Sequence, residues 1–283
     1  MKLDPGQAGE DRRNLAEALR DLRQASGLSG ERLARRCGMS QSKVSRIETG
    51  RLLPSALDVE LMLTALGVDD ETRAELAELA RVANAEYQDV RASAKRGLHH
   101  RQQELAALEA SATEMRHFLP TLITGLLQTP DYMRAAMSTP IEPAAGDVSP
   151  AIARKLERQT VLHDGRKQFS FLLTESAMRW QLCAPSVMAV QLDHLVSVSR
   201  LPNVRLGVLP LSTPVPEGAY HTFVTYDRRL VTAELFTGQL IMREPKDIEH
   251  YRALFDFFAE HARWGDEART FLTAAADTFR SSK

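Results

Sequence analysis

Four residues near the N-terminus stand in a spacing that admits few folds, Ala34-x3-Gly38-x5-Val44-x2-Ile47. Two short helices that cross at a steep angle need a small residue where they touch, and Ala34 provides one. The short turn between them needs a residue that tolerates positive φ, and Gly38 provides that. Val44 and Ile47 then hold the second helix against the first. The spacing therefore predicts a helix-turn-helix.

Capping residues and apolar periodicity extend this prediction to a helical domain over residues 1–68. Ser29, Ser40 and Ser55 each stand where the N-cap of a helix is expected. Leucines at helical spacing predict one further helix before them. The helices are expected over 11–26, 30–37, 41–49 and from Ser55 onward.

The outward face of the predicted second motif helix is polar throughout. It presents Gln41, Ser42, Lys43, Ser45 and Arg46, with no large apolar residue among them. In the major groove, Gln pairs with adenine, Arg or Lys pairs with guanine, and Ser bonds several base edges. This face, within residues 40–49, is therefore the predicted base-reading surface.

The charge of the chain is unevenly distributed. Residues 11–51 hold ten Lys and Arg against five acids, a net +5, so the rest carries −6 of the total −1. A basic region on a near-neutral chain suits phosphate binding by one domain. Charge alone is equally compatible with a solvated helical surface.

The stretch LSGERLARRCGMSQSKVSRIETGRLLPS resembles the XRE-type helix-turn-helix of phage repressors and many bacterial regulators. The resemblance implies base contacts from the start of the recognition helix. It also places Thr49 and Arg51 beside the phosphate backbone, and Ser40, Arg35 and Arg36 are further candidate phosphate contacts. The family usually has Gln where Gly30 stands, so one expected phosphate contact is absent. The alternative is a helical bundle that uses the same turn for protein contacts.

The remainder of the chain predicts a helical linker over 69–114 and an α+β domain with a mixed sheet over 115–283. Acidic residues at 69–71 suit the positive end of a helix, and helical composition continues to about 111 apart from Gly97. Strands and helices then alternate, followed by three strands in close succession, which indicates a mixed sheet. Strands are expected near 169–173, 204–208, 222–226, 231–235 and 239–242, and helices near 132–137, 150–163, 187–198, from 245 and over 266–279.

The segment LPTLITGLLQTPDYMRA resembles the opening signature of the Scr1-type domain, which follows an XRE helix-turn-helix in bacterial regulators. Further matches are RKLERQTVL, LLTESAMR and QLDHLVSVSRLPNVRLGVLP. The resemblance implies an antitoxin-like domain that acts with a small protein partner. Leu126, Leu127, Gln128 and Tyr132 are the candidate partner surface, and a buried scaffold turn is the alternative. Partner binding, small-molecule sensing and dimerisation all remain open for this domain.

Several classes of protein are not indicated by the sequence. No apolar run is long enough for a membrane span, and the polar N-terminus does not look like a secretory signal. Cys37 and Cys183 are far apart, which predicts a reducing cytoplasm without a disulfide or a zinc site. Glu175 and His221 stand beside predicted strands, but no catalytic motif accompanies them. We expect no catalytic residues, no metal and no cofactor.

These patterns predict a cytoplasmic, nucleoid-associated regulator of transcription that binds double-stranded DNA as a homodimer. A single recognition helix covers few base pairs, and a two-fold pair reads two half-sites. A small protein partner, encoded nearby, is expected to modulate it through the C-terminal domain. The alternatives are an antitoxin-like module whose main role is to neutralise that partner, and a regulator that senses a small molecule.

Overall fold

The computed structural model describes residues 5–89, 98–138, 147–236 and 238–282. The chain divides into two compact units. The first combines residues 1–89 with 238–248, and the second combines 90–237 with 249–283. The first unit is therefore built from two separate parts of the chain.

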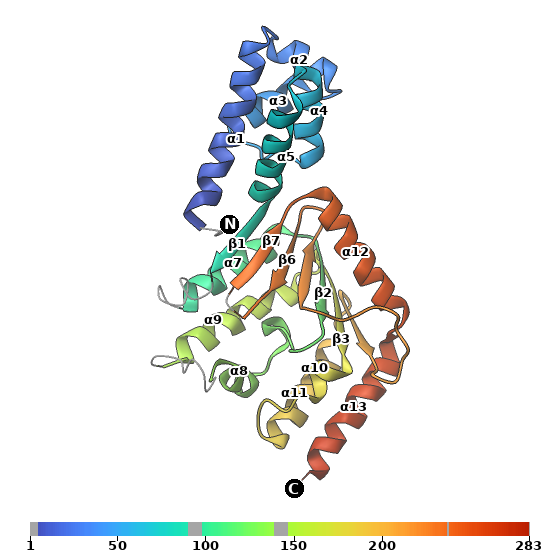
Figure 1. The fold of residues 1–283 in the computed structure, drawn as a ribbon. Coiled ribbons are helices and arrows are strands. Elements are labelled where there is room, and N and C mark those ends of the chain that lie inside the picture. Colours follow the sequence, from blue (N-terminus) through green and yellow to red (C-terminus); the bar gives the residue numbers. More distant parts are fainter. Residues whose placement is uncertain (1–4, 90–97, 139–146, 237, 283) are drawn as a thin grey trace. The chain divides into compact units, whose positions relative to one another are not determined.

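The first unit is a bundle of helices around one apolar core (Figure 1). Its helices are α1 (Pro5–Ala25), α2 (Gly30–Arg36), α3 (Gln41–Glu48), α4 (Ala56–Leu66) and α5 (Asp70–Asn84). The predicted helices of this region are present, and α1 begins earlier than expected. Fully buried side chains come from each of the first four helices: Leu15, Leu19, Leu33, Val44, Ile47, Val59, Met62 and Leu63.

The predicted helical linker over 69–114 is wrong in two respects. The helix α5 belongs to the first unit, because Leu76 and Ala80 are buried in its core. It is followed by a strand, β1 (Ala85–Asp89), which pairs antiparallel with β7 (Gly238–Met242). The strand β1 forms because a distant segment supplies its hydrogen bonds, and local composition does not reveal that partner. Gly97 and the rest of 90–97 lie outside the described residues.

The second unit contains a mixed sheet, as predicted. Its strands lie in the order β6-β5-β2-β3-β4-β8. The neighbours β2, β3 and β4 are parallel, whereas β5, β6 and β8 run antiparallel to their partners. The bounds are β2 (Glu114–Leu119), β3 (Gln168–Thr174), β4 (Val204–Leu209), β5 (Phe223–Tyr226), β6 (Leu230–Glu234) and β8 (Arg263–Trp264). The first and last of these strands in the chain were not predicted as strands.

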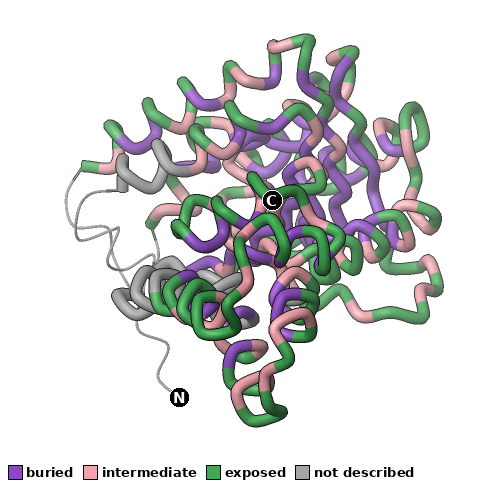
Figure 2. Tube along the Cα trace, turned by 90° about the horizontal axis from the view of Figure 1, so that it is seen from above, coloured by how far each residue is buried: buried purple, intermediate pink, exposed green. Residues whose placement is uncertain are grey.

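Helices cover both faces of this sheet. They are α7 (Leu98–Ser111), α8 (Pro130–Met137), α9 (Ser149–Gln159), α10 (Glu175–Arg179), α11 (Pro185–Val198), α12 (Pro245–Glu260) and α13 (Gly265–Ser281), with 3₁₀ turns η1 (Gly125–Leu127) and η2 (Thr160–His163). Buried positions are concentrated on the strands and on the inner sides of these helices (Figure 2). None of the helices among the described residues is long and apolar enough to cross a membrane.

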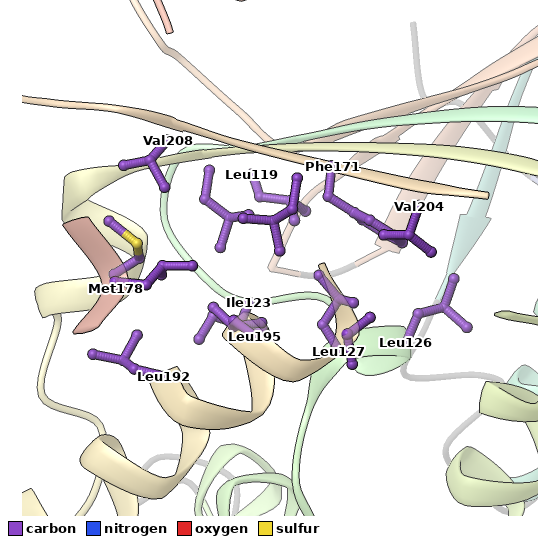
Figure 3. Packing of buried hydrophobic residues seen from close by; sticks show 14 of the residues in the cluster. Leu119, Ile123, Leu126, Leu127, Phe171, Met178, Leu192, Leu195, Val204 and Val208 are labelled. Atoms are coloured by element: carbon purple, nitrogen blue, oxygen red, sulfur yellow. The ribbon is translucent and has the colours of Figure 1, made fainter. Parts of the chain in front are cut away.

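The larger part of the core lies on one face of the sheet. Side chains of β2, β3 and β4 there meet Leu192 and Leu195 of α11 and the 3₁₀ turn η1 (Figure 3). On the opposite face, Phe118 stacks on Phe258 of α12 with ring centroids 4.5 Å apart. Alternate residues along each strand thus enter different layers, which is the pattern of a sheet buried on both sides.

Candidate nucleic-acid interface

The turn between α2 and α3 is fixed by backbone hydrogen bonds. Gly38 adopts a φ of +65°. The amide of Met39 donates to the carbonyl of Ala34 at 2.9 Å, and the amide of Gly38 donates to that of Arg35 at 3.4 Å. This pair of bonds is the Schellman pattern that ends a helix at a glycine. The turn therefore requires the backbone freedom of Gly38, as the spacing predicted.

The ends of the predicted recognition helix α3 are capped by side chains. The Ser40 hydroxyl accepts from the Lys43 amide at 3.2 Å, which satisfies a free donor of the first turn. At the other end, the Thr49 hydroxyl donates to the Ser45 carbonyl at 2.8 Å. Val44 and Ile47 are fully buried beneath the helix. Caps and anchors together hold α3 as a rigid element.

One arc of α3 is exposed and polar. With about 100° between successive residues, Gln41, Ser42, Ser45, Arg46 and Thr49 fall within about 140° of the helix circumference. All five are exposed. Among the described residues, Arg46 has no ion-pair partner. The helix therefore offers hydroxyls, one amide and one guanidinium on a single side.

Lys43 does not share this arc. Its ammonium lies 2.6 Å from Oδ1 of Asp58 on α4. The other carboxylate oxygen of Asp58 accepts from the Ser55 amide at 3.2 Å, and the Ser55 hydroxyl accepts from the Asp58 amide, which completes a capping box. In the free protein Lys43 therefore ties α3 to α4, and its charge is already compensated.

A second ion pair ties α3 to α1, and the sequence reasoning missed it. Arg23 donates to both carboxylate oxygens of Glu48, through Nε at 2.6 Å and Nη2 at 3.0 Å. Its Nη1 donates to the Leu28 carbonyl at 2.9 Å. The hydrogen bonds to Glu48 raise the pKa of Arg23. Arg23 therefore positions α3, and its charge, which contributes to the net +5 of residues 11–51, is compensated by Glu48.

The predicted phosphate-contacting residues lie in different settings. Arg35 forms an exposed ion pair with Glu31 at 3.0 Å, and Arg36 donates to the Ala65 carbonyl at 3.3 Å. Arg51 is exposed after the end of α3. A Cβ at Gly30 would meet nothing within 4 Å, so packing does not exclude the glutamine that the XRE pattern has at that position.

The predicted partner surface is wrong, because its residues are buried. Leu126, Leu127 and Tyr132 have no exposed area, and Gln128 is 3% exposed. Leu126 and Leu127 point into the core between the sheet and α11 (Figure 3). The Gln128 amide donates to the Ile123 carbonyl at 2.7 Å and so closes the turn. The signature segment is a scaffold turn, the alternative that the sequence had left open.

Helices α9 and α11 brace this turn with polar side chains. The Gln159 amide donates to the carbonyls of Gly125 and Gln128, at 2.9 and 2.8 Å. Gln191 accepts from the Thr129 amide at 2.7 Å and donates to the Leu127 carbonyl at 2.6 Å. A backbone that turns against a core needs such partners, because its buried polar groups are shielded from water.

A pocket of about 610 Å³ opens beside α7, α9 and the turn before β3. Glu109 and Arg158 line it and form an ion pair at 3.2 Å, with side chains 3% and 6% exposed. Burial raises the pKa of Glu109 to about 7. Lys167 also lines the pocket, and its ammonium donates to the carbonyls of Glu109, Ala110 and Ala112 at the end of α7.

The residues weighed as catalytic candidates have structural partners. Glu175 accepts from Nε of Arg179 at 2.5 Å and from the Leu211 amide at 2.9 Å. Nε2 of His221 lies 2.9 Å from the Tyr251 hydroxyl. The part of the chain that the structure describes contains no group of three or more His, Cys, Asp or Glu placed to hold a metal ion.

Two family models match the chain. A helix-turn-helix domain model matches residues 14–76, and the model of a domain of unknown function, DUF5753, matches residues 102–274. No curated protein matches the chain. The helix-turn-helix match supports a DNA-binding regulator, in agreement with the geometry of α2 and α3.

Two solved structures show weak similarity. One is a phospholipase D family member, Nuc from Salmonella typhimurium, at 12% identity and a TM-score of 0.34, with 58% of this chain and 90% of that chain covered. The other is TrmBL2, an archaeal chromatin protein described as showing a novel mode of DNA binding, at 11% identity and a TM-score of 0.32. That match covers 72% of this chain and 60% of the archaeal one.

Proposed function

This chain belongs to the family of the domain of unknown function DUF5753, and we propose that it is a sequence-specific transcriptional regulator of the XRE type. In this proposal α3 enters the major groove. Gln41, Ser42, Ser45 and Arg46 read base edges, while Ser40, Thr49, Arg51, Arg35 and Arg36 contact phosphates. Lys43, which the sequence had placed among the base-reading residues, is paired with Asp58. In this proposal it contacts DNA only after that ion pair breaks.

The observation that carries the proposal is the exposed polar arc of α3 on a helix that is held from three sides. Val44 and Ile47 anchor it below, Glu48 bonds α1, and Lys43 bonds α4. A base-reading helix gains from such rigidity, because fewer degrees of freedom are lost on binding. A helix used only for packing would not leave an amide, a guanidinium and hydroxyls on one side.

The regulator is proposed to act as a homodimer. Leu57 and Leu61 lie one turn apart on α4 and are 59% and 38% exposed, so they offer a small apolar contact within the DNA-binding unit. Two recognition helices related by a two-fold axis would read half-sites spaced by one or more helical turns. Sedimentation of Leu57→Glu and of the parent chain tests this. The variant is expected to sediment as a monomer, and a dimer mass for the variant would show that Leu57 is not part of the dimer contact.

The proposed function is tested by titrating the full chain against fluorescent DNA from its own promoter region and against a scrambled duplex, at two salt concentrations. We expect tighter promoter binding that weakens steeply with salt, since each phosphate contact releases counterions. Equal weak binding to both duplexes would contradict sequence reading by the chain alone.

The assignment of residues has its own test. Gln41→Ala and Arg46→Ala should each cost about 1–3 kcal/mol at particular base pairs, whereas Arg51→Ala should weaken all sequences by similar amounts. Equal losses from all three, across a set of operator variants, would show that the division into base and phosphate contacts is wrong.

The second unit is proposed to modulate DNA binding in the cytoplasm, without enzymatic activity, through a small protein partner. An antitoxin-like role, in which neutralising that partner is the main task, is one variant of this proposal. A second candidate function is small-molecule sensing, and the pocket beside Glu109 favours it. Its volume lies in the range of ligand sites, and α7, which forms one wall, is the described element that follows the DNA-binding unit in the chain.

A further inference from the structure

Most of the exposed large apolar side chains of the second unit belong to segments at one edge of its sheet. Those exposed in the described part of this unit are Leu122, Leu156, Trp180, Val190, Leu211, Tyr220, Leu235 and Phe236. All except Leu156 and Val190 lie in segments that adjoin the ends of β2 to β6. Isolated apolar residues on a surface need no explanation, but a gathering of them does.

The strand register places these segments together. The parallel strands β2, β3 and β4 end at Leu119, Thr174 and Leu209, which therefore share one edge, called here the carboxyl edge. The antiparallel strand β5 begins at this edge and β6 ends there, since Phe223 pairs with both Phe118 and Ala233. Every segment that carries one of the six side chains leaves or enters the sheet at the carboxyl edge.

Hydrogen bonds connect these segments in turn. The Thr174 hydroxyl donates to the Pro120 carbonyl at 2.8 Å and joins the segments after β3 and β2. The Leu211 amide donates to Glu175 at 2.9 Å and joins the segment after β4 to α10, directly before Trp180. The Glu234 amide donates to the Thr222 carbonyl at 2.9 Å and joins the ends of β6 and β5. The segments that carry the six exposed apolar side chains therefore lie next to one another along the carboxyl edge, and these six side chains are called here the row.

One member of the row lies against the backbone although it is exposed. Tyr220 is 83% exposed, and its ring lies so close to Gly218 that a Cβ there would come within 2.5 Å of it. A glycine at position 218 therefore leaves room for the ring in this position. Trp and Tyr are the side chains that most often dominate protein interfaces, because they offer a large rigid area at low entropic cost.

Charges in the same segments indicate what kind of surface would cover the row. These segments contain the charged residues Glu175, Arg179, Glu217 and Glu234. Glu175 and Arg179 neutralise each other in an ion pair, which leaves Glu217 and Glu234 as the net charge of the rim. A second copy of the chain, related by a two-fold axis, would bring these acids against the same acids.

We propose that the carboxyl edge of the second unit is a docking surface for a partner protein that presents aromatic or aliphatic side chains within a basic rim. The carboxyl ends of parallel strands are also where open sheets commonly bind their ligands. This proposal deepens the partner-modulation part of the proposed function and rests on it, but it does not depend on DNA recognition by α3.

The test is selection of displayed random dodecapeptides on the full chain, followed by affinity measurement of the enriched sequences. Enriched peptides should combine apolar residues with Lys or Arg. Trp180→Ser with Tyr220→Ser should weaken them about tenfold or more, because truncating a central aromatic contact has that effect. Val190→Ser, which removes an exposed apolar side chain outside the edge segments, should leave the affinity unchanged.

The role of the two acids is tested by the double variant Glu217→Lys, Glu234→Lys. This variant should bind the basic peptides more weakly, and a new selection on it should enrich acidic peptides. The proposal is overturned if no peptide is enriched, if enriched peptides bind the Trp180→Ser, Tyr220→Ser variant equally well, or if the charge reversal changes nothing. It is also overturned if sedimentation shows self-association that this variant abolishes, because a second copy is then the occupant. Promoter binding by the same variants should be unchanged, which separates this test from that of DNA reading.

Discussion

Each unit of the molecule holds a glutamate against an arginine, but the two pairs differ in completeness. In the first unit, Arg23 and Glu48 form two hydrogen bonds, with side chains 16% and 9% exposed. In the second unit, Arg158 and Glu109 are more deeply buried, and Oε2 of Glu109 has no hydrogen-bond partner among the described residues. In the first pair both carboxylate oxygens of the glutamate are hydrogen-bonded, at the boundary of a core. In the second pair one carboxylate oxygen has no hydrogen bond, and the pair lies inside a core.

The difference shows what each pair contributes. An arginine that donates two hydrogen bonds to one carboxylate has a defined geometry and gives α3 a fixed orientation against α1. A carboxylate that is shielded from water favours its neutral form, which is why burial raises the pKa of Glu109 to about 7 although the charges of Arg158 and Lys167 act in the opposite direction. The first pair is expected to act through geometry at all ordinary pH values, and the second to respond to pH. The following measurements separate these roles.

Removing the deep arginine should have the largest effect. Arg158→Ala removes the ion-pair partner of Glu109, leaves Lys167 as the other nearby cation, and should cost about 3–5 kcal/mol of unfolding free energy at pH 8. The loss should be smaller at pH 6, because Glu109 then takes up a proton. Urea unfolding at both pH values measures this, with Arg154→Ala, from an exposed pair with Glu157, as the control at under about 1 kcal/mol. Equal losses from both variants would contradict the comparison.

Glu109 should make the stability of the folded chain depend on pH. Its pKa is raised from 4.5 to about 7, so the folded chain retains a proton that the unfolded chain releases. The resulting stabilisation is fully present below about pH 4.5 and is lost as pH rises through 7, with a total of about 3 kcal/mol. Unfolding free energies of the parent chain and of Glu109→Gln, compared from pH 4.5 to 8, should diverge by this amount. Parallel curves would exclude Glu109 as the titrating group.

Removing Arg23 should have a smaller effect on stability and a clear effect on DNA binding. Arg23→Ala is expected to cost about 2 kcal/mol, because it leaves Glu48 with unmade charged hydrogen bonds. Promoter affinity should fall further than this loss explains at protein concentrations where the chain stays folded. Arg20→Ala is the matched control, since Arg20 lies 3.9 Å from Asp21 in an exposed pair. Promoter affinity equal to that of the parent chain would show that α3 is positioned without this pair.

Releasing Lys43 should have the smallest effect and the opposite sign. Asp58→Asn keeps an acceptor for the Ser55 amide but removes the charge that holds Lys43. We expect DNA affinity to rise severalfold for promoter and scrambled duplexes alike, with a salt dependence steeper by about one phosphate contact. Specificity that improves instead would mean that Lys43 reads a base. Lys43→Met in the Asp58→Asn background should cancel the gain.

The recognition helix was predictable from the sequence because its determinants are local. A turn glycine, two apolar anchors and capping serines fix α3 within a few residues, and the exposed arc follows from helical periodicity. The partners of Lys43 and Glu48 were not predictable, because they lie 15 and 25 residues away, on helices whose packing the local pattern does not specify. The exposed arc of α3 is therefore determined by the local sequence, whereas the orientation of α3 is determined by its contacts with the other helices of the bundle.

In the second unit, alternation predicted the strands β3 to β6 and hence the mixed sheet. Alternation did not show whether the signature segment at Leu126 to Tyr132 is buried or exposed, because a glutamine among leucines is compatible with a buried turn and with a partner surface. The deciding fact is that three glutamine side chains, Gln128, Gln159 and Gln191, reach from three different segments and bond backbone groups of residues 123–129. Pairing of β1 with β7 was likewise invisible, since it joins segments about 150 residues apart.

That last pairing affects how the protein is made. The helices α1 to α5 are complete once residue 84 leaves the ribosome, but the partner of β1 is translated only after residues 90–237 of the second unit. At ordinary rates of synthesis the interval is roughly 10–30 s. During that time the backbone groups of Ala85–Asp89 lack the strand that pairs with them in the folded chain, and unpaired backbone of this kind can recruit other chains. The first unit is therefore completed only when residues 238–242 have been made, and a fragment that stops at residue 89 would leave the backbone groups of Ala85–Asp89 without this partner.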